Sequence, residues 1–142
     1  MISEYLANKL LDHALGETEY TFPAAPFLAL SKGCPVFQTA TVATEVATGS
    51  GYARVQVAME AADDGITYID DRVAFPDASG GDWADEDDPI THWFLVDSTS
   101  EGGGNWLFAG RLECPITVVD GDAGPVVKDR AIMISLRGQL DS

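Results

Sequence analysis

The densest group of side chains that could do chemistry in this sequence is acidic. Five carboxylates fall within residues 82–88, namely Asp82, Asp85, Glu86, Asp87 and Asp88. Calcium prefers several oxygen ligands on a flexible loop, but this segment lacks the alternating ligands, the central glycine and the distal glutamate of an EF-hand. We therefore predict a solvated acidic loop and no cofactor, with structural calcium at residues 82–88 as the alternative.

Nucleophilic catalysis would require a histidine beside a nucleophile and an orienting acid. The two histidines, His13 and His92, lie in no catalytic motif, and the chain contains no Gly-x-Ser-x-Gly segment. Cys34 and Cys114 are far apart in the chain and lack the paired spacing of a redox or zinc motif. The sequence predicts that the chain is not an enzyme, has no catalytic or metal-binding residues, and keeps both thiols free and buried.

The charge balance excludes whole classes of partner. The chain has 142 residues with 23 acidic and 8 basic side chains, a formal net charge of −15. Residues 60–101 carry thirteen acids against the single basic residue Arg72. Such a surface repels nucleic acid and anionic lipid, and no apolar run approaches the roughly 18–20 residues that span a bilayer. We expect one strongly negative side, and attachment to a partner through the more neutral remainder.

The elements that must position these residues follow from hydrophobic periodicity. Ser3 is a suitable N-cap and Gly16 a suitable stop for a helix over residues 3–15, which carries an apolar stripe. Short segments rich in β-branched and aromatic residues follow, and they predict strands near residues 26–31, 52–59, 66–75, 90–97, 105–112, 115–119 and 131–137. The fold class predicted is all-β, an antiparallel and jelly-roll-like β-sandwich with one short N-terminal α-helix, forming a single domain over residues 1–142.

Two segments carry more specific expectations. Across residues 52–59 the side chains alternate with a period of two, and we expect Ala53, Val55, Val57 and Met59 to face inward. Residues 32–50 have few strand signals, so we expect a connection that serves as a contact arm.

Several motifs, in this order, resemble those of one small phage virion protein family. They are YLANKLLDHALG, YTFPAAPFLALS, Glu45 shortly before GYARV, VAFPDA, ITHWFLVD and GGGNWLFAGRL. Members of this family are commonly labelled phage tail fibre proteins, and they are similar to capsid decoration (cement) proteins. The resemblance runs from Leu6 to Leu136 and implies a β-sandwich virion structural component. The sequence departs from the family pattern in DWADEDDP, in residues 32–37 and in the charged stretch 130–137.

Within that family, we expect a decoration protein on the outer surface of the capsid head, because packaged DNA would repel a chain of charge −15. Its expected partners are the major capsid protein and copies of itself, as a homo-oligomer such as a trimer. The expected interface residues are Ile2, Tyr5, Leu6, Leu10, Tyr52 and Arg54. As a lone cation among acids, Arg54 is either an internal ion-pair anchor or a contact to the capsid lattice.

The sequence is also compatible with two other functions. A tail or tail-fibre component would form a stable homotrimer, although the sequence has no coiled-coil heptads or fibrous repeat. A carbohydrate-binding virion module would use Trp83, Trp93 or Trp106 as a stacking platform, whereas core packing is the commoner use of tryptophan.

Overall fold

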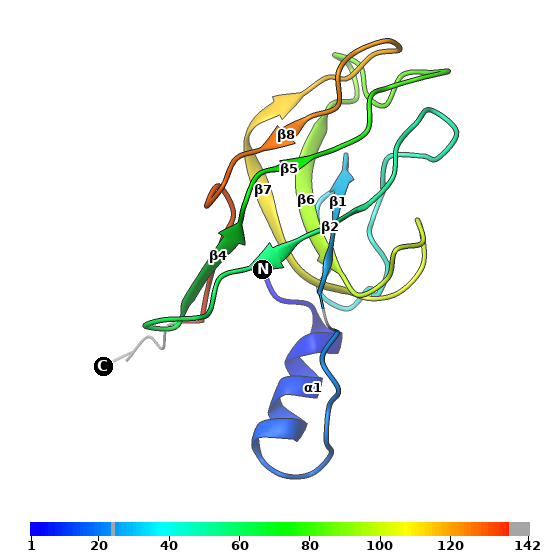
Figure 1. Cartoon of the computed structure of the whole chain (residues 1–142). Coiled ribbons are helices and arrows are strands. Elements are labelled where there is room, and N and C mark those ends of the chain that lie inside the picture. The colour runs from blue at the N-terminus through cyan, green and yellow to red at the C-terminus, as the bar shows by residue number, and fades with distance from the viewer. Residues whose placement is uncertain (24, 137–142) are drawn as a thin grey trace.

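The computed structural model describes residues 1–23 and 25–136 and is built mainly of antiparallel strands. Figure 1 shows a sandwich of strands with a single helix projecting from one end. The elements are α1 (Glu4–Ala14), β1 (Phe27–Ser31), β2 (Val55–Gln56), β3 (Ala58–Met59), β4 (Ile66–Asp70), β5 (Val73–Ala74), β6 (Ile90–Val96), β7 (Trp106–Ile116), β8 (Val126–Val127) and β9 (Met133–Ser135).

One layer is a four-stranded sheet in the order β2-β1-β6-β7, and the other consists of the smaller sheets β3-β4-β9 and β5-β8. Every pair of neighbouring strands is antiparallel. Between the layers lies a core that includes Leu28, Leu30 and Leu95 from the large sheet and Ile69 and Phe75 from the opposite side. The predicted all-β sandwich with one short N-terminal helix is confirmed.

The other face of the four-stranded sheet is also buried, because residues 32–50 fold back over it. Val42 from this segment joins a second core cluster with Phe94 and Trp106, whose rings meet edge-on at 5.5 Å between centroids. The Trp106 indole N–H donates to the Thr39 carbonyl at 2.5 Å, and the Trp106 backbone N–H donates to the Ala40 carbonyl at 2.9 Å. The predicted contact arm therefore packs on the chain's own sheet.

The helix begins where the sequence predicts and is attached by its first residues. The Leu6 backbone N–H donates to the Ser3 hydroxyl at 3.1 Å, an N-cap that fixes the first turn. The preceding residues lie along β7: the Ser3 N–H donates to the Leu107 carbonyl and the Ala109 N–H to the Met1 carbonyl. This pairing covers the open edge of β7 and leaves the helix beyond the end of the sandwich (Figure 1).

The predicted strand over residues 52–59 is divided, and its expected facing is wrong at the start. Tyr52 and Arg54 are the buried residues there, and the buried positions change phase before Val57. The phase changes because Tyr52 and Arg54 precede β2 and lie outside any strand, whereas Val55, Val57 and Met59 pack against the core as predicted. β2 and β3 are separate strands because β2 pairs with β1 and β3 pairs with β4.

Other predicted bounds change as well. The strand expected over 66–75 breaks at Asp71, whose φ of 71° is left-handed and incompatible with a continuous ladder. The segment expected at 105–112 and the first residues of the one expected at 115–119 form the single strand β7, which ends at Ile116, and β8 was not predicted. The last residue of the strand predicted over 131–137 lies outside the described residues. Both cysteines are free but exposed, so their predicted burial is wrong.

Candidate functional site

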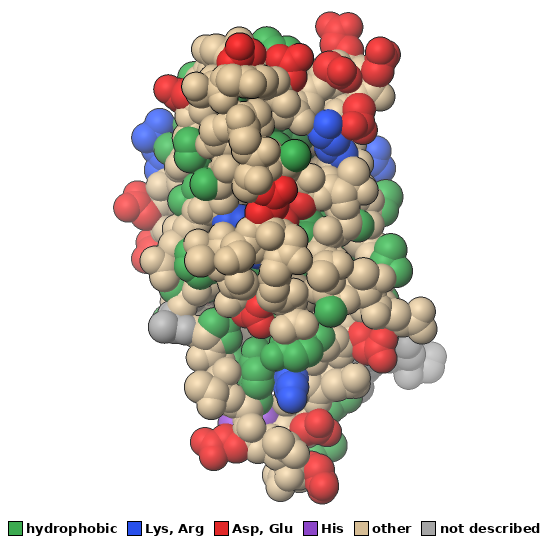
Figure 2. All heavy atoms as spheres, turned by 90° about the vertical axis from the view of Figure 1, so that its right-hand side faces the viewer, with side chains coloured by type: hydrophobic (Ala, Val, Ile, Leu, Met, Phe, Trp, Pro, Cys, Tyr) green, Lys and Arg blue, Asp and Glu red, His purple; other side chains and the backbone are tan. Residues whose placement is uncertain are grey.

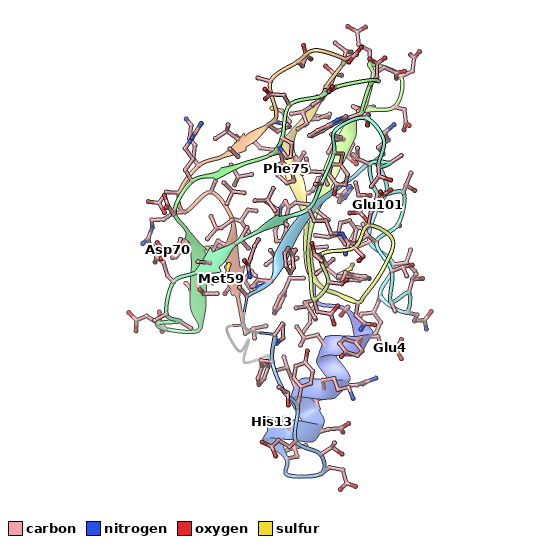
Figure 3. All side chains as sticks on the ribbon, turned by 45° about the vertical axis from the view of Figure 1, so that its right-hand side comes forward. Glu4, His13, Met59, Asp70, Phe75 and Glu101 are labelled. Carbon is pink, nitrogen blue, oxygen red and sulfur yellow. The ribbon has the colours of Figure 1, made fainter. Side chains whose placement is uncertain are left out.

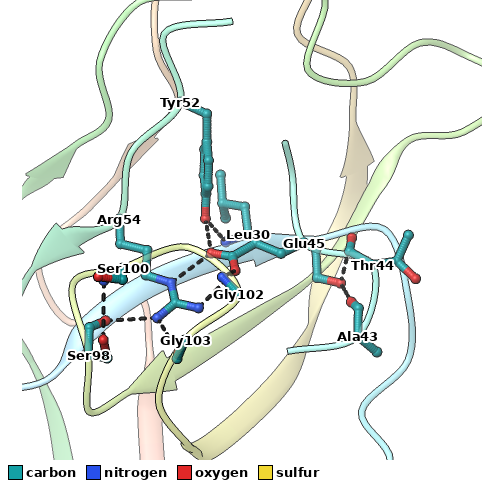
Figure 4. Close-up of polar contacts among 11 residues, drawn as sticks. Leu30, Ala43, Thr44, Glu45, Tyr52, Arg54, Ser98, Ser100, Gly102 and Gly103 are labelled. Atoms are coloured by element: carbon teal, nitrogen blue, oxygen red, sulfur yellow. Dashed lines mark hydrogen bonds and ion pairs between the residues drawn. The ribbon is translucent and has the colours of Figure 1, made fainter. Parts of the chain in front are cut away.

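Two regions bring the sequence-marked residues together, and the first is a buried polar network, defined here as Glu45, Tyr52 and Arg54. The Arg54 guanidinium donates to both Glu45 carboxylate oxygens, each at 2.8 Å (Figure 4). The Tyr52 hydroxyl donates to Glu45 Oε1 at 2.8 Å and accepts from the Leu30 backbone N–H at 3.0 Å. Burial, and then the charge of Glu45, raise the pKa of Tyr52, so the phenol keeps its proton and remains a donor.

The network joins two loops that are distant in the chain. Arg54 Nη1 donates to the Ser98 carbonyl at 2.8 Å and to the Gly103 carbonyl at 3.0 Å, while the Gly102 N–H donates to Glu45 Oε2 at 3.2 Å (Figure 4). The side chains of Arg54 and Glu45 are 0% and 4% exposed. Among the described residues no buried side-chain nitrogen or oxygen lacks a partner, so the charges are fully satisfied.

These contacts decide between the two roles expected for Arg54 in the free chain: it is an internal ion-pair anchor. Tyr52 and Arg54 are buried, and their polar groups are used within the fold. Leu6 is also buried, but its side chain lines an apolar groove beside α1.

The second region is an apolar groove, called the helix groove below, between α1, the returning segment 20–26 and the sheet β3-β4-β9. Its volume is about 330 Å³. Figure 3 shows Met59 on the sheet side and His13 near the end of α1. The described residues that line the helix groove carry no charge, and they include Leu6, Leu10, Tyr20, Phe22, Met59, Ile66, Phe108 and Ile134.

An aromatic cluster holds the returning segment against the helix. The Tyr20 ring meets those of Tyr5 and Phe22 edge-on, at 6.3 and 4.7 Å between centroids, and Phe22 meets His13 in the same way at 5.6 Å. Burial, and then a hydrogen bond with Tyr5, raise the pKa of Tyr20 to about 12. Tyr20 therefore adds no charge to the helix groove at neutral pH.

A second hollow adjoins the helix groove. It has a volume of about 310 Å³ and shares Phe108, Ile134 and Leu136 with the helix groove. Met1 and Ile2 also line it. Apolar surface is therefore continuous from the returning segment, past β9, to the N-terminus.

The sequence model of one protein family, described as Podophage GP4 fiber I protein gp80, matches residues 1–134. The chain belongs to this family. The match covers the network, the helix groove and nearly every strand, and it confirms the resemblance to phage fibre proteins. The chain accordingly has a structural role in the virion. No curated protein is similar enough to count as a match.

In this fiber I family member, the tryptophans mainly serve the core. Trp83 and Trp106 are 2% and 0% exposed, and the Trp83 indole N–H donates to the Ser50 carbonyl at 2.6 Å. Trp93 lies against Gly110 on the neighbouring strand, where a Cβ atom would collide with its ring. Trp83 and Trp106 therefore present no free ring face on which a sugar could stack.

Several carboxylates of the acidic loop accept hydrogen bonds from backbone N–H groups or form an ion pair. Asp85 Oδ1 accepts from the N–H groups of Asp87 and Asp88, and Asp82 accepts from the N–H of Asp120 at 2.7 Å. Asp88 pairs with Lys32 at 2.9 Å. The sequence gives no sign of this arrangement beyond the excess of acids.

Elsewhere, the ligand atoms of Glu60, Asp70 and Asp129 lie within 4.8 Å of one another. The Glu60 carboxylate, however, already binds the Arg130 guanidinium at 2.8 Å. This arrangement is an ion-pair group, and we assign it no metal. No helix within the described residues is long and apolar enough to cross a membrane.

Part of the helix groove was predicted from the sequence. Leu6 and Leu10 line it, and Ile2 lines the adjoining hollow, whereas Tyr5 contributes through the aromatic cluster. Phe22 and Met59 were not predicted as site residues, and they come from the returning segment and from the far sheet. The usable signal for Phe22 was the aromatic pair in YTFP, which begins at residue 20, shortly after the helix.

Proposed function

We propose that the chain is a non-enzymatic structural subunit of the phage tail-fibre assembly, attached through its helix end. The observation that carries this proposal is the uncharged helix groove with its adjoining hollow, on a chain whose net charge is −15. Apolar surface of this kind typically marks a protein–protein contact. The fibre assignment rests on the description of the family to which the chain belongs.

The proposed contact surface consists of the apolar residues that the fold leaves accessible at this end. Ile2, Tyr5 and Leu10 remain from the sequence prediction, and Phe22 and Met59 join them through the helix groove. Tyr52 and Arg54 act indirectly, because they hold loops of the sandwich in place. Other copies of the chain belong to the proposed assembly, since fibres are built from repeated subunits.

Capsid decoration is the second candidate, and the charge distribution favours it. Figure 2 shows a group of acidic side chains at the end opposite the helix, with basic side chains nearby, and further acidic side chains at the helix end. A subunit on the capsid exterior would contact the major capsid protein through its helix end and expose this acidic end to solvent. An acidic outer end also keeps neighbouring virions from associating.

The deciding experiment is electron cryo-microscopy of intact virions. Density that fits the sandwich and helix at the tail supports the fibre assignment, with α1 facing a neighbouring protein. Regular density at local symmetry axes of the head supports decoration instead. Virions that contain no copy of the chain, as measured by mass spectrometry, would overturn both candidates.

A further inference from the structure

The helix groove is suited to a few apolar side chains. Its volume of about 330 Å³ lies at the small end of the range of roughly 300–1,000 Å³ typical of ligand pockets. Aliphatic and aromatic side chains make up nearly all of its described lining, with Leu10 and Phe22 on the helix side and Met59 and Ile66 on the sheet side. An occupant must therefore bring apolar groups, because a buried charge would find no counter-charge there.

The rim of the helix groove has the opposite character. Asp63 follows the lining residue Ala62, Glu19 precedes the lining residue Tyr20, and both acids are exposed. The nearest basic group on α1, the Lys9 ammonium, lies over the Tyr5 ring at 5.9 Å from its centroid. An apolar floor beside exposed carboxylates attracts an occupant that carries positive charges next to its apolar residues.

We propose that the helix groove binds an apolar segment flanked by lysine or arginine residues, supplied by a different virion protein. This inference rests on the proposed function and gives the chemistry of the partner. We favour a different protein over a second copy of the chain because of charge complementarity. A second copy would bring another net charge of −15 to the same acidic rim. Binding of this basic partner must weaken as the salt concentration rises, whereas association of two acidic copies would strengthen.

Photo-crosslinking within assembled virions identifies the occupant. Phage are produced with p-benzoylphenylalanine in place of Phe22, which lines the helix groove, and separately in place of Val126, which does not. The two side chains are similarly exposed, at 49% and 45%, so Val126 is a matched control. After irradiation, the adducted peptides are sequenced by mass spectrometry.

The expected result is an adduct from position 22, and not from position 126, on an apolar segment of another protein with lysine or arginine on its flanks. An adduct on a second copy of the chain overturns the proposal in favour of self-association. Virions that contain the chain substituted at position 22, but give no adduct there, overturn the proposal alone. Virions without the chain overturn the proposed function, and this inference with it.

Salt-dependent release tests the charge of the rim separately. Virions carrying Asp63→Asn with Glu19→Gln are compared with virions carrying Glu86→Gln with Asp87→Asn, a matched pair of exposed acids in the acidic loop. The expected result is that the rim variant leaves the virion at a lower NaCl concentration than the parent, while the loop variant behaves as the parent. Equal release of both variants, or stronger retention at higher salt, contradicts the proposed partner chemistry.

Discussion

The buried polar network and the helix groove are two regions of the same sandwich that use opposite chemistry. In the network, Glu45 accepts from Tyr52, from the Arg54 guanidinium and from the Gly102 N–H, so its charge is fully engaged within the chain. In the helix groove the described lining side chains have no charge and stay open on one side. The comparison indicates that the most distinctive residues of the sequence serve folding, while ordinary apolar residues line the groove that we propose as the contact.

The largest effect is expected from breaking the network. Arg54→Ala removes the counter-charge of Glu45 and the donor to the Ser98 and Gly103 carbonyls. Leaving one buried charge unpaired typically costs about 3–5 kcal/mol, so we expect the free energy of unfolding to fall by that amount in urea titrations at pH 7. A loss of this size would confirm that the network braces the sandwich.

Two further variants keep that prediction testable. The double variant Glu45→Gln with Arg54→Met removes both charges, and we expect it to recover part of the lost stability. Arg130→Ala breaks the ion pair with Glu60, whose partners are 53% and 30% exposed, and should cost at most about 1 kcal/mol. Equal costs for Arg54→Ala and Arg130→Ala would contradict the structural role of the network.

The network also shows what the sequence could predict. A lone arginine among acids predicted an internal ion pair as one of two roles for Arg54, and the pair with Glu45 is present. Which acid would pair with it did not follow, since the contact depends on the fold-back of residues 32–50 over the sheet. The facing of Tyr52 and Arg54 was predicted wrongly, because both residues precede β2 and the alternation pattern does not reveal where the strand begins.

A smaller effect within the same network is expected from Tyr52→Phe. The substitution keeps the ring, which is stacked on Phe75 at 6.3 Å between centroids, but removes the hydroxyl that joins Leu30 to Glu45. A buried donor left unsatisfied costs about 1–3 kcal/mol, so urea titrations should show a loss in that range. If the loss of stability is smaller than this range, a crystal structure of the variant should show a water molecule in place of the hydroxyl.

A pH response is expected from His92 in β6. Burial, and then the positive charge of Arg111, lower the pKa of His92 in the folded chain below its ordinary value of about 6.5. The unfolded chain therefore binds more protons, so this contribution is complete above pH 6.5 and is lost as the pH falls below that value. Thermal unfolding from pH 8 to pH 5 should show a decrease that His92→Gln reduces.

Less of the helix groove than of the network could be predicted from the sequence. The apolar stripe of the helix was predicted, and Leu6 and Leu10 do line the groove. The opposite wall comes from Met59, Ile66 and Ile134, which a pattern along the chain cannot place against the helix. Long-range packing of three separate strands decides that arrangement, and local propensity does not record it.

The smallest effect on stability, and the sharpest test of the comparison, is expected from Phe22→Asp. Phe22 is half exposed at the edge of the helix groove, and its ring meets Tyr20 and His13, so the free energy of unfolding should fall by about 0.5–1.5 kcal/mol. Val126→Asp, outside the groove, should change it by no more than about 0.5 kcal/mol. Incorporation into virions, measured by quantitative mass spectrometry, should be lost for Phe22→Asp alone, because the new carboxylate faces an apolar occupant. Full incorporation of both variants would mean that the groove is not the contact. A large loss of stability in Phe22→Asp would mean instead that the aromatic cluster stabilises the fold as much as the network does. The network and the helix groove would then both serve folding, and the contrast between them would be wrong.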